Sequence, residues 1–212
     1  MPGKFITFEG PEGSGKSTQI QLLVEKLEQQ GIRATCSREP GGTATGEQIR
    51  NLLQHDAAGE PLADRAELLL FTASRAQLMD RVILPILDTG DWVVCDRFID
   101  STMAYQGYAR GMDIATLDAI NAFAIYDKKP DLTILLDLDI EVGFQRLEKR
   151  YAGSGESHDR FELEARDFHR RVRDGYQRLA EREDERFCVI DANLPISEVA
   201  SEVWNAVKGA LL

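Results

Sequence analysis

The chain has 212 residues, of which 43% are hydrophobic, so it can bury the core of one substantial α/β domain. Its formal net charge of −11 argues against a broad nucleic-acid-binding surface. No apolar run approaches the ~20 residues that span a bilayer, and the N-terminus lacks a signal-peptide pattern, so we expect a cytoplasmic protein that binds neither membrane nor nucleic acid.

The first third of the chain alternates between strand-like and helix-like patterns. Residues 4–9 are apolar and β-rich, which predicts a buried strand. After a glycine-rich stretch, Ile20, Leu23 and Leu27 recur at helical spacing, and Gly31 follows as a helix stop. The next segments predict a strand at 34–38, a loop at 39–43, a short helix at 47–53 and a loop at 56–64.

The alternation continues to the end of the chain. A long helix is predicted over residues 65–89, bent near Pro85 because proline removes a backbone hydrogen bond. Strands are expected at 92–95, 132–136 and 187–190, and helices at 114–126, 142–149, 168–179 and 199–211. Alternating strands and helices imply a parallel sheet covered on both faces. Residues 151–159 are polar and glycine-rich, which predicts a mobile loop.

Residues 10–17 match G-x-x-x-x-G-K-[ST], the phosphate-binding loop, between a predicted strand and a predicted helix. The glycines allow the loop to curl so that several N–H groups face one anion at the helix N-terminus. Lys16 is expected to reach the β- and γ-phosphates of a nucleoside triphosphate, and the Ser17 hydroxyl to ligate Mg²⁺. The expected triphosphate contacts are Gly10, Pro11, Glu12, Gly13, Ser14, Gly15, Lys16, Ser17 and Thr18.

Charged residues follow several of the predicted strands, where ligands bind to parallel sheets. Asp96 ends one strand and is our candidate for holding Mg²⁺ together with Ser17, because Arg97 follows it as a second phosphate ligand. Asp137 ends another strand and is the rival. Guanidinium groups suit phosphates, and the arginines expected near the site are Arg38, Arg75, Arg97, Arg146, Arg150 and Arg160. Arg150 and Arg160 flank the glycine-rich loop, as expected for a lid.

Cysteine and histidine spacing does not indicate a metal centre. Cys36, Cys95 and Cys188 are far apart in strand-like segments, and we interpret them as buried free thiols. His55, His158 and His169 are interpreted as surface or loop residues.

Five motifs occur in order around the phosphate loop. They are Phe8-Glu9-Gly10, Arg38-Glu39-Pro40-Gly41-Gly42-Thr43, Asp96-Arg97-Phe98, Ala104-Tyr105-Gln106-Gly107 and Asp159-Arg160-Phe161-Glu162. Over essentially the whole chain, this set resembles bacterial thymidylate kinase. The resemblance implies a three-layer P-loop NTPase fold with a five-stranded parallel sheet, in a single nucleoside-monophosphate-kinase domain over 1–212 with a mobile lid at about 146–162. It also implies ATP + dTMP → ADP + dTDP, with Mg²⁺, in a cytoplasmic homodimer.

The same resemblance implies roles for individual residues. Lys16, Arg97, Arg150 and Arg160 are the expected catalytic residues. Glu12 matches an acid near the dTMP sugar and phosphate, and Arg38 and Arg97 match residues that bind the acceptor phosphate. Phe71 matches the aromatic residue that stacks on thymine, and Arg75 matches the arginine that hydrogen-bonds the base. Thr102 and Gln106 match polar positions near the base edge, and Tyr105 matches a residue packed beneath the deoxyribose. Some family members carry an arginine at the position of Gly13, and this chain is similar to those that draw it from the lid instead, with Arg146 as a further candidate.

Two alternatives stay open on the sequence. One is a kinase for another nucleoside monophosphate. The other is a GTP-binding switch protein, which usually carries an Asn-Lys-x-Asp motif; Lys128-Lys129-Pro130-Asp131 has the wrong first residue for it.

Overall fold

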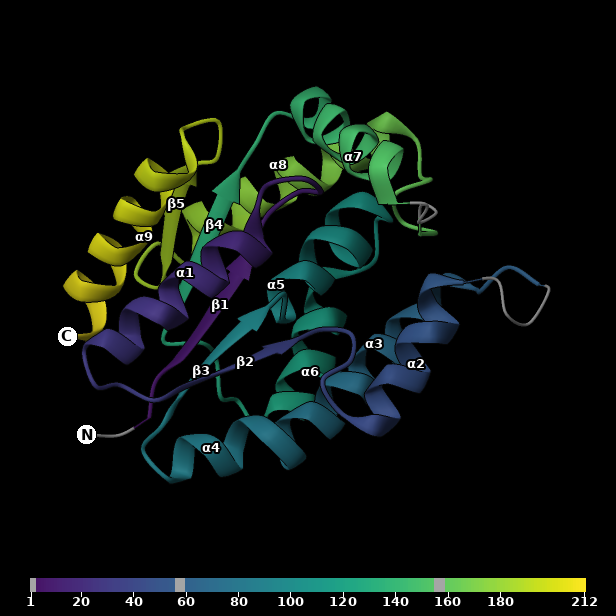
Figure 1. The fold of residues 1–212 in the computed structure, drawn as a ribbon. Helices are drawn as coiled ribbons and strands as arrows, with labels where there is room; N and C mark the ends of the chain where they lie inside the picture. The colour runs from purple at the N-terminus through teal and green to yellow at the C-terminus, as the bar shows by residue number, and fades with distance from the viewer. Residues whose placement is uncertain (1–2, 56–59, 155–158) are drawn as a thin grey trace.

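The centre of the molecule is a five-stranded parallel sheet in a computed structural model that describes residues 3–55, 60–154 and 159–212. The strands lie in the order β2-β3-β1-β4-β5 (Figure 1). Their bounds are β1 (Phe5–Glu9), β2 (Ala34–Arg38), β3 (Trp92–Asp96), β4 (Leu132–Asp137) and β5 (Phe187–Asp191). The α/β fold with five parallel strands is therefore confirmed.

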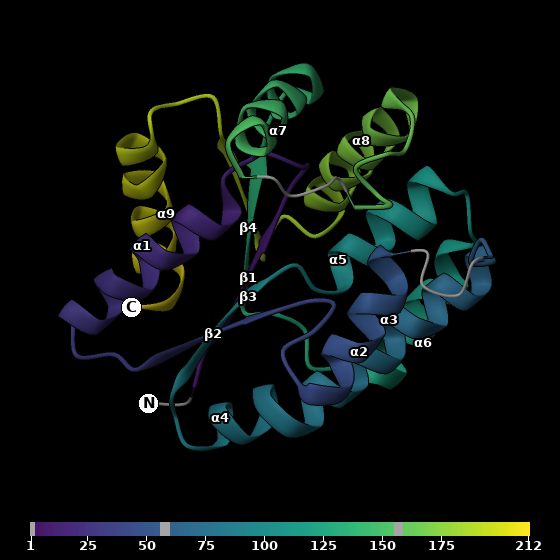
Figure 2. The ribbon, with the colours of Figure 1, turned by 45° about the vertical axis from the view of Figure 1, so that its right-hand side comes forward.

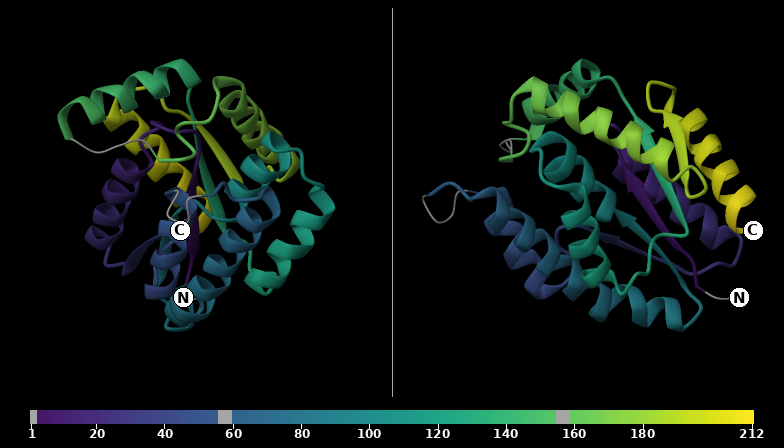
Figure 3. Two further views of the ribbon diagram at one scale, coloured as in Figure 1. Left: turned by 90° about the vertical axis from the view of Figure 1, so that its right-hand side faces the viewer. Right: turned by 180° about the vertical axis from the view of Figure 1, so that it is seen from behind.

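Helices cover both faces of the sheet and make three layers (Figure 2). One face carries α1 (Lys16–Gln29) and α9 (Ile196–Leu211), and the other carries α3 (Asp64–Leu78), α6 (Ile114–Ile125) and α8 (Arg166–Arg182). Seen from behind, α8 crosses the β4–β5 side of the sheet (Figure 3). α2 (Ala44–Gln54) packs on α3, and α7 (Ile140–Ser154) follows β4.

The central strands β1, β3 and β4 are largely apolar because both of their faces are buried, whereas the edge strand β2 is mostly exposed. On β1, Ile6 and Phe8 point into the layer of α1 and α9, while Phe5 points to the other side, where it meets Phe98 edge-on at 4.9 Å between ring centroids. This alternation places successive β1 side chains in two separate apolar clusters, so the sheet forms the wall between them.

The long helix expected over 65–89 is continuous but changes its winding before Pro85. α3 ends at Leu78, a π-helical turn η1 spans Met79–Ile83, and α4 (Leu84–Asp88) carries Pro85 in its first turn. Proline has no N–H to donate to residue 81, and the wider π turn brings the chain past that missing bond. The structure thus shows a π turn just before Pro85, where a bend is expected.

A helical segment between β3 and α6 was not predicted from the sequence pattern. It comprises α5 (Ile99–Thr102) and the π-helical η2 (Met103–Ala109). Six of the seven η2 residues are buried, polar Gln106 among them, so the segment has no polar face to produce an amphipathic period. Its residues belong to the candidate site described below.

The expected loop at 151–159 is partly wrong. α7 continues to Ser154, five residues beyond the predicted end of that helix. Tyr151 holds the added turn in place, because its hydroxyl donates to Glu162 Oε2 at 2.6 Å and accepts from Arg150. Residues 155–158 of the expected loop lie outside the described residues, as do residues 56–59 of the loop expected at 56–64.

Two interpretations of cysteine and histidine need correction. Cys95 is buried as expected, but Cys36 is exposed and Cys188 is half-buried, because β2 and β5 are the edge strands of the sheet. His169 was expected at the surface and is 2% exposed, packed edge-on against Phe144 and Phe168. His55 is exposed as expected, and His158 lies outside the described residues.

Candidate active site

The phosphate-binding loop connects β1 to α1, as its mechanism requires. Gly15 is the N-cap of α1 with φ 89°, a conformation that side-chain-bearing residues rarely adopt. Lys16 begins the helix, and its Nζ donates to the carbonyl oxygens of Gly10 and Pro11 at 3.1 Å each. Burial, followed by the charge of Arg97, lowers the pKa of Lys16. The loop therefore gathers a buried ammonium group and a helix N-terminus at one place.

Asp96 fits the role of a Mg²⁺ ligand better than Asp137. Ser17 Oγ donates to Asp96 Oδ2 at 3.3 Å, and Asp96 Oδ1 is buried with no hydrogen-bond partner among the described residues. Oxygen ligands of this kind suit Mg²⁺, which also keeps several waters. Asp137 instead accepts hydrogen bonds from Arg173 Nε and Nη2 at 2.7 and 2.9 Å, so its carboxylate is already paired with a guanidinium group.

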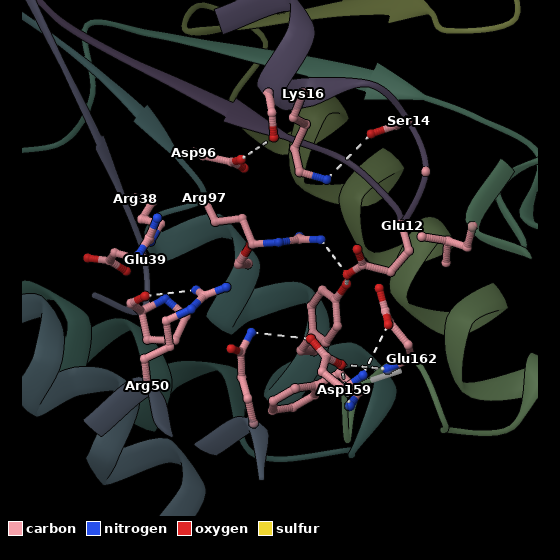
Figure 4. A pocket seen from close by; sticks show the side chains of 18 of the residues that line it. Glu12, Ser14, Lys16, Arg38, Glu39, Arg50, Asp96, Arg97, Asp159 and Glu162 are labelled. Atoms are coloured by element: carbon pink, nitrogen blue, oxygen red, sulfur yellow. Dashed lines mark hydrogen bonds and ion pairs between the residues drawn. The ribbon is translucent and has the colours of Figure 1, made fainter. Parts of the chain in front are cut away.

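A cavity of about 990 Å³ lies where the strands end. Figure 4 shows Lys16 and Asp96 on one side of it and Arg38, Arg50 and Glu162 on others. Of the residues predicted from the sequence, the cavity is lined by Glu12, Gly13, Ser14, Gly15, Lys16, Ser17, Thr18, Arg38, Phe71, Arg75, Asp96, Arg97, Thr102, Tyr105, Gln106, Arg146 and Arg150. Gly10, Pro11 and Arg160 do not line it.

Arg97 and Glu12 form an ion pair in the lining of the cavity. Arg97 Nη2 donates to Glu12 Oε1 at 2.6 Å, and the Tyr105 hydroxyl donates to the same oxygen at 2.9 Å. Burial acts to raise the pKa of Glu12, but Arg97, Lys16 and Tyr105 together outweigh it and lower that pKa to about 2. Glu12 is therefore ionised at neutral pH and offsets part of the local positive charge.

Arg75 lies at the far end of the cavity and is 1% exposed. Its Nε and Nη2 donate to Glu39, its Nη1 to Asn121 Oδ1 at 2.7 Å, and its Nη2 also to Thr102 Oγ1 at 3.0 Å. These contacts fix the plane of the guanidinium group. An aromatic wall stands beside it, in which Phe71 and Tyr105 contact Phe161 at 5.6 and 6.1 Å between ring centroids.

Arg50 lines the cavity and was not found from the sequence. It lies on α2, where its Nη1 donates to Pro40 O at 2.9 Å, close to the Arg38–Glu47 ion pair. Burial lowers the pKa of Arg50, and Arg38 lowers it further by like-charge repulsion. The available signal was its spacing: Arg50 lies one helical turn after Glu47, in a helix that follows directly on the Arg38–Thr43 motif.

The three arginines expected in the lid differ in where they point. Arg146 donates to Gly13 O at 3.3 Å and to Ala192 O, and Arg150 donates to Tyr151 and to Glu162. Arg160 points away from the cavity, toward Leu53 O and the buried carboxylate of Glu67. In this arrangement Arg146 and Arg150 reach the phosphate loop side, whereas Arg160 is held against α3.

The first turn of α7 approaches the phosphate loop so closely that a side chain at either contact position would not fit. A Cβ added at Gly13 would lie 2.5 Å from Gly143 O, and one added at Gly143 would come equally close to Glu12 O. Gly13 also has φ 73°. An arginine side chain at position 13 would therefore collide with the backbone of α7 in this structure.

Comparisons with known proteins converge on one family. The family model for thymidylate kinase matches residues 8–203. The chain is 48% identical over 208 residues to the thymidylate kinase of Trichlorobacter lovleyi, covering 98% of each protein. It is 50% identical over 217 aligned positions to that of Pelotomaculum thermopropionicum, covering 99% of this chain and 98% of the relative.

A solved structure is similar over the same extent. The crystal structure of thymidylate kinase from Ehrlichia chaffeensis superposes with a TM-score of 0.77 at 37% sequence identity. The match covers 98% of this chain and 99% of the other. Both sequence and fold are thus shared from end to end.

Proposed function

Because the chain belongs to the thymidylate kinase family, we propose that it transfers the γ-phosphoryl group of ATP to dTMP, giving ADP and dTDP for dTTP biosynthesis. The observation that carries the proposal is a single cavity with the phosphate loop on one side and Arg97, Arg75 and Phe71 on the other. Such a cavity suits two nucleotides whose phosphates meet at its centre. Incubation with ATP, Mg²⁺ and dTMP should yield ADP and dTDP in equal amounts.

At the triphosphate end, Lys16 would bind the β- and γ-phosphates, with the loop amides around them. Ser17 and Asp96 would hold Mg²⁺, which when bound neutralises charge on the phosphate oxygens. The free oxygen of Asp96 supports this assignment.

At the acceptor end, Arg97 and Arg38 would hold the dTMP phosphate, and Arg50 is a further cation for that task. Phe71 would stack on thymine, while Arg75, Thr102 and Gln106 would meet its polar edge and Tyr105 would pack beneath the deoxyribose. Glu12 would face the sugar and phosphate.

The proposed reaction needs no covalent intermediate with the protein and little acid–base catalysis. A phosphate monoester has its second pKa near ~6, so dTMP is mostly a dianion at neutral pH and needs no general base. The protein must bring two anions together and stabilise the charge on the moving phosphoryl group, which is a task of positioning and electrostatics. Lys16, Arg97 and the lid arginines supply the positive charge for it.

We further propose that residues 1–212 act as one domain whose lid, residues 146–162, closes over the phosphates. Closure would exclude water and suppress ATP hydrolysis. Gly13 lacks a side chain, so Arg150 and Arg160 would serve the transferring phosphoryl group. None of the helices in the described part of the chain is long and apolar enough to cross a membrane. The homodimer and the cytoplasmic location stay predictions.

Phe71→Ala is expected to raise KM for dTMP by about 10-fold or more with a smaller change in kcat. Stacking on the base is present in both ground and transition states, so its loss weakens binding rather than the chemical step. Steady-state kinetics at saturating ATP measure this effect, and KM for ATP serves as the internal control. An unchanged KM for dTMP would argue against stacking.

A further inference from the structure

We propose that Glu9 is a positioning residue for this reaction, which holds the Arg97 guanidinium at the acceptor phosphate without itself touching a substrate. Glu9 is the last residue of β1, is 0% exposed and does not line the cavity. The inference rests on the proposed function, because that function gives Arg97 its task. It is carried by the hydrogen bonds that connect the two residues.

The Glu9 carboxylate accepts four hydrogen bonds, all from residues next to Arg97 or in contact with it. Oε1 accepts from Phe98 N at 2.8 Å and from Ser101 N at 3.3 Å. Oε2 accepts from Ser101 Oγ at 2.6 Å and from the Tyr176 hydroxyl at 2.8 Å. A buried carboxylate with this many donors is fixed in orientation, so it can fix its neighbours in turn.

One pair of bonds holds the backbone beside Arg97. Arg97 has φ 66°, in the left-handed region that non-glycine residues adopt only where the surroundings hold them. This turn directs the N–H of Phe98 toward Glu9 Oε1 and the Arg97 side chain toward the cavity. The carboxylate thus stabilises the conformation from which Arg97 projects.

The other pair of bonds holds the guanidinium group itself. Arg97 Nη1 donates to the Tyr176 hydroxyl oxygen at 3.0 Å and to Ser101 Oγ at 3.2 Å. Each hydroxyl has one hydrogen, and donating it to Glu9 leaves the oxygen free to accept from Arg97. The two hydroxyl oxygens also lie 2.8 Å from each other, and Arg97 Nη1 contacts Gly10 O at 3.2 Å. Glu9 is the acceptor that both hydroxyls share, so it favours the arrangement in which both oxygens accept from Arg97.

The position of this carboxylate is unfavourable for folding, which separates its role from that of a structural ion pair. Burial, and then the charge of Asp100, raise the pKa of Glu9 to about 7 against the lowering by Arg97, Ser101 and Tyr176. Lys16 is a further charged group that interacts with Glu9. An acid whose pKa is raised on folding binds more protons in the folded state. Its contribution to the free energy of unfolding therefore decreases as the pH rises from 4.5 to 7.

Glu9→Gln tests the proposal because glutamine keeps the shape and one acceptor oxygen. That oxygen can still accept from Phe98 and Ser101 N–H, but the amide nitrogen turns both hydroxyl hydrogens away from position 9. The expected result is a ~10- to 100-fold lower kcat/KM for dTMP, with KM for ATP within ~2-fold of wild type. Thermal unfolding at pH 8 should give a Tm equal to or above that of wild type.

The decisive comparison is the same substitution in an Arg97→Ala background. If Glu9 acts through Arg97, adding Glu9→Gln there changes kcat/KM for dTMP by less than ~2-fold. If the fold-losses in kcat/KM from the two substitutions multiply in the double variant, the proposal is wrong. It is also wrong if Glu9→Gln alone leaves kcat/KM for dTMP unchanged, or if it raises KM for ATP as much as KM for dTMP.

Asp100→Asn is the matched control. Asp100 is another buried carboxylate, paired with Arg186 at 2.7 Å. Its charge raises the pKa of Glu9, so the substitution favours the ionised form of Glu9 and leaves the hydrogen bonds of Glu9 in place. It should lower Tm and leave both KM values near wild type. If Asp100→Asn also lowered kcat/KM for dTMP without changing KM for ATP, the effect would not be specific to Glu9, and the proposal would be wrong.

If the Glu9→Gln variant does not fold, the Tyr176→Phe variant tests the same hydrogen bonds between Glu9 and Arg97. It removes one hydroxyl between Glu9 and Arg97 and should raise KM for dTMP several-fold but not KM for ATP; equal effects on both contradict the proposal. A wild-type protein that does not phosphorylate dTMP contradicts the proposed function, whereas an active wild type with indifferent variants contradicts only the role of Glu9.

Discussion

Replacing Arg97 with alanine is expected to lower kcat/KM for dTMP by about 10³-fold, within the range that loss of a phosphate-binding arginine produces. The guanidinium is the central cation of the cavity, and its loss also leaves Glu12 without its partner. Arg97 is the main group that lowers the pKa of Glu12 against the effect of burial, so its loss leaves a buried carboxyl group whose charge is offset only by Lys16 and the weaker contacts around it. Two unfavourable changes thus follow from one substitution.

Steady-state kinetics in both substrates check this expectation. KM for ATP should change far less than the dTMP parameters, since Lys16 and the loop amides remain. Arg97→Lys should recover only part of the activity, because lysine lacks the planar fork that contacts Glu12, Ser101 and Tyr176 together. A kcat/KM for dTMP within ~3-fold of wild type in Arg97→Ala would remove Arg97 from the acceptor site.

Arg160→Ala is expected to lower kcat by about 10³-fold with little change in either KM, as expected for an arginine that acts on the transferring phosphoryl group. In the structure this side chain pairs with buried Glu67, which also accepts from Gln106 and Arg110. Its proposed task therefore requires that it leave Glu67 when the lid closes. Arg150 already lines the cavity and needs a smaller movement.

The two lid arginines can be separated by making both alanine variants. Arg170→Ala is the matched control, because Arg170 is an exposed arginine on α8 that pairs with Asp167. Near wild-type turnover in Arg160→Ala, with a large loss in Arg150→Ala, would assign the role to Arg150 alone. If both variants turned over normally, the lid assignment would be wrong.

Much of the fold could be predicted because its signals are local. The apolar run before Gly10, the helical spacing after Ser17 and the charged residues after several strands are properties of short windows. The parallel sheet follows from their alternation. The strand order places β1 between β3 and β4, and this order follows from long-range packing that no short window contains.

The parts that could not be predicted depend on burial from all sides or on contacts across the chain. The Ile99–Ala109 segment has no polar face, so it has no helical period. Asp96 and Asp137 each end an apolar strand, and the sequence favours Asp96 only because Arg97 follows it. The contacts with Ser17 and Arg173, which lie far away in the chain, distinguish the two carboxylates in the structure. Arg160 belongs to a lid motif, but its direction is set by Glu67, 93 residues earlier in the chain.

The most direct test of the account is the ADP-release rate with dTMP, dUMP, AMP, GMP and CMP as acceptors at saturating MgATP. We expect kcat/KM to be highest for dTMP, with the purine monophosphates and CMP at least ~10³-fold lower, because a site built to bond one base leaves buried polar groups unpaired with another. Discrimination between dTMP and dUMP should be weaker, since they differ by one methyl group. Equal or faster turnover with AMP, GMP or CMP, or ADP release that needs no acceptor, would contradict the account.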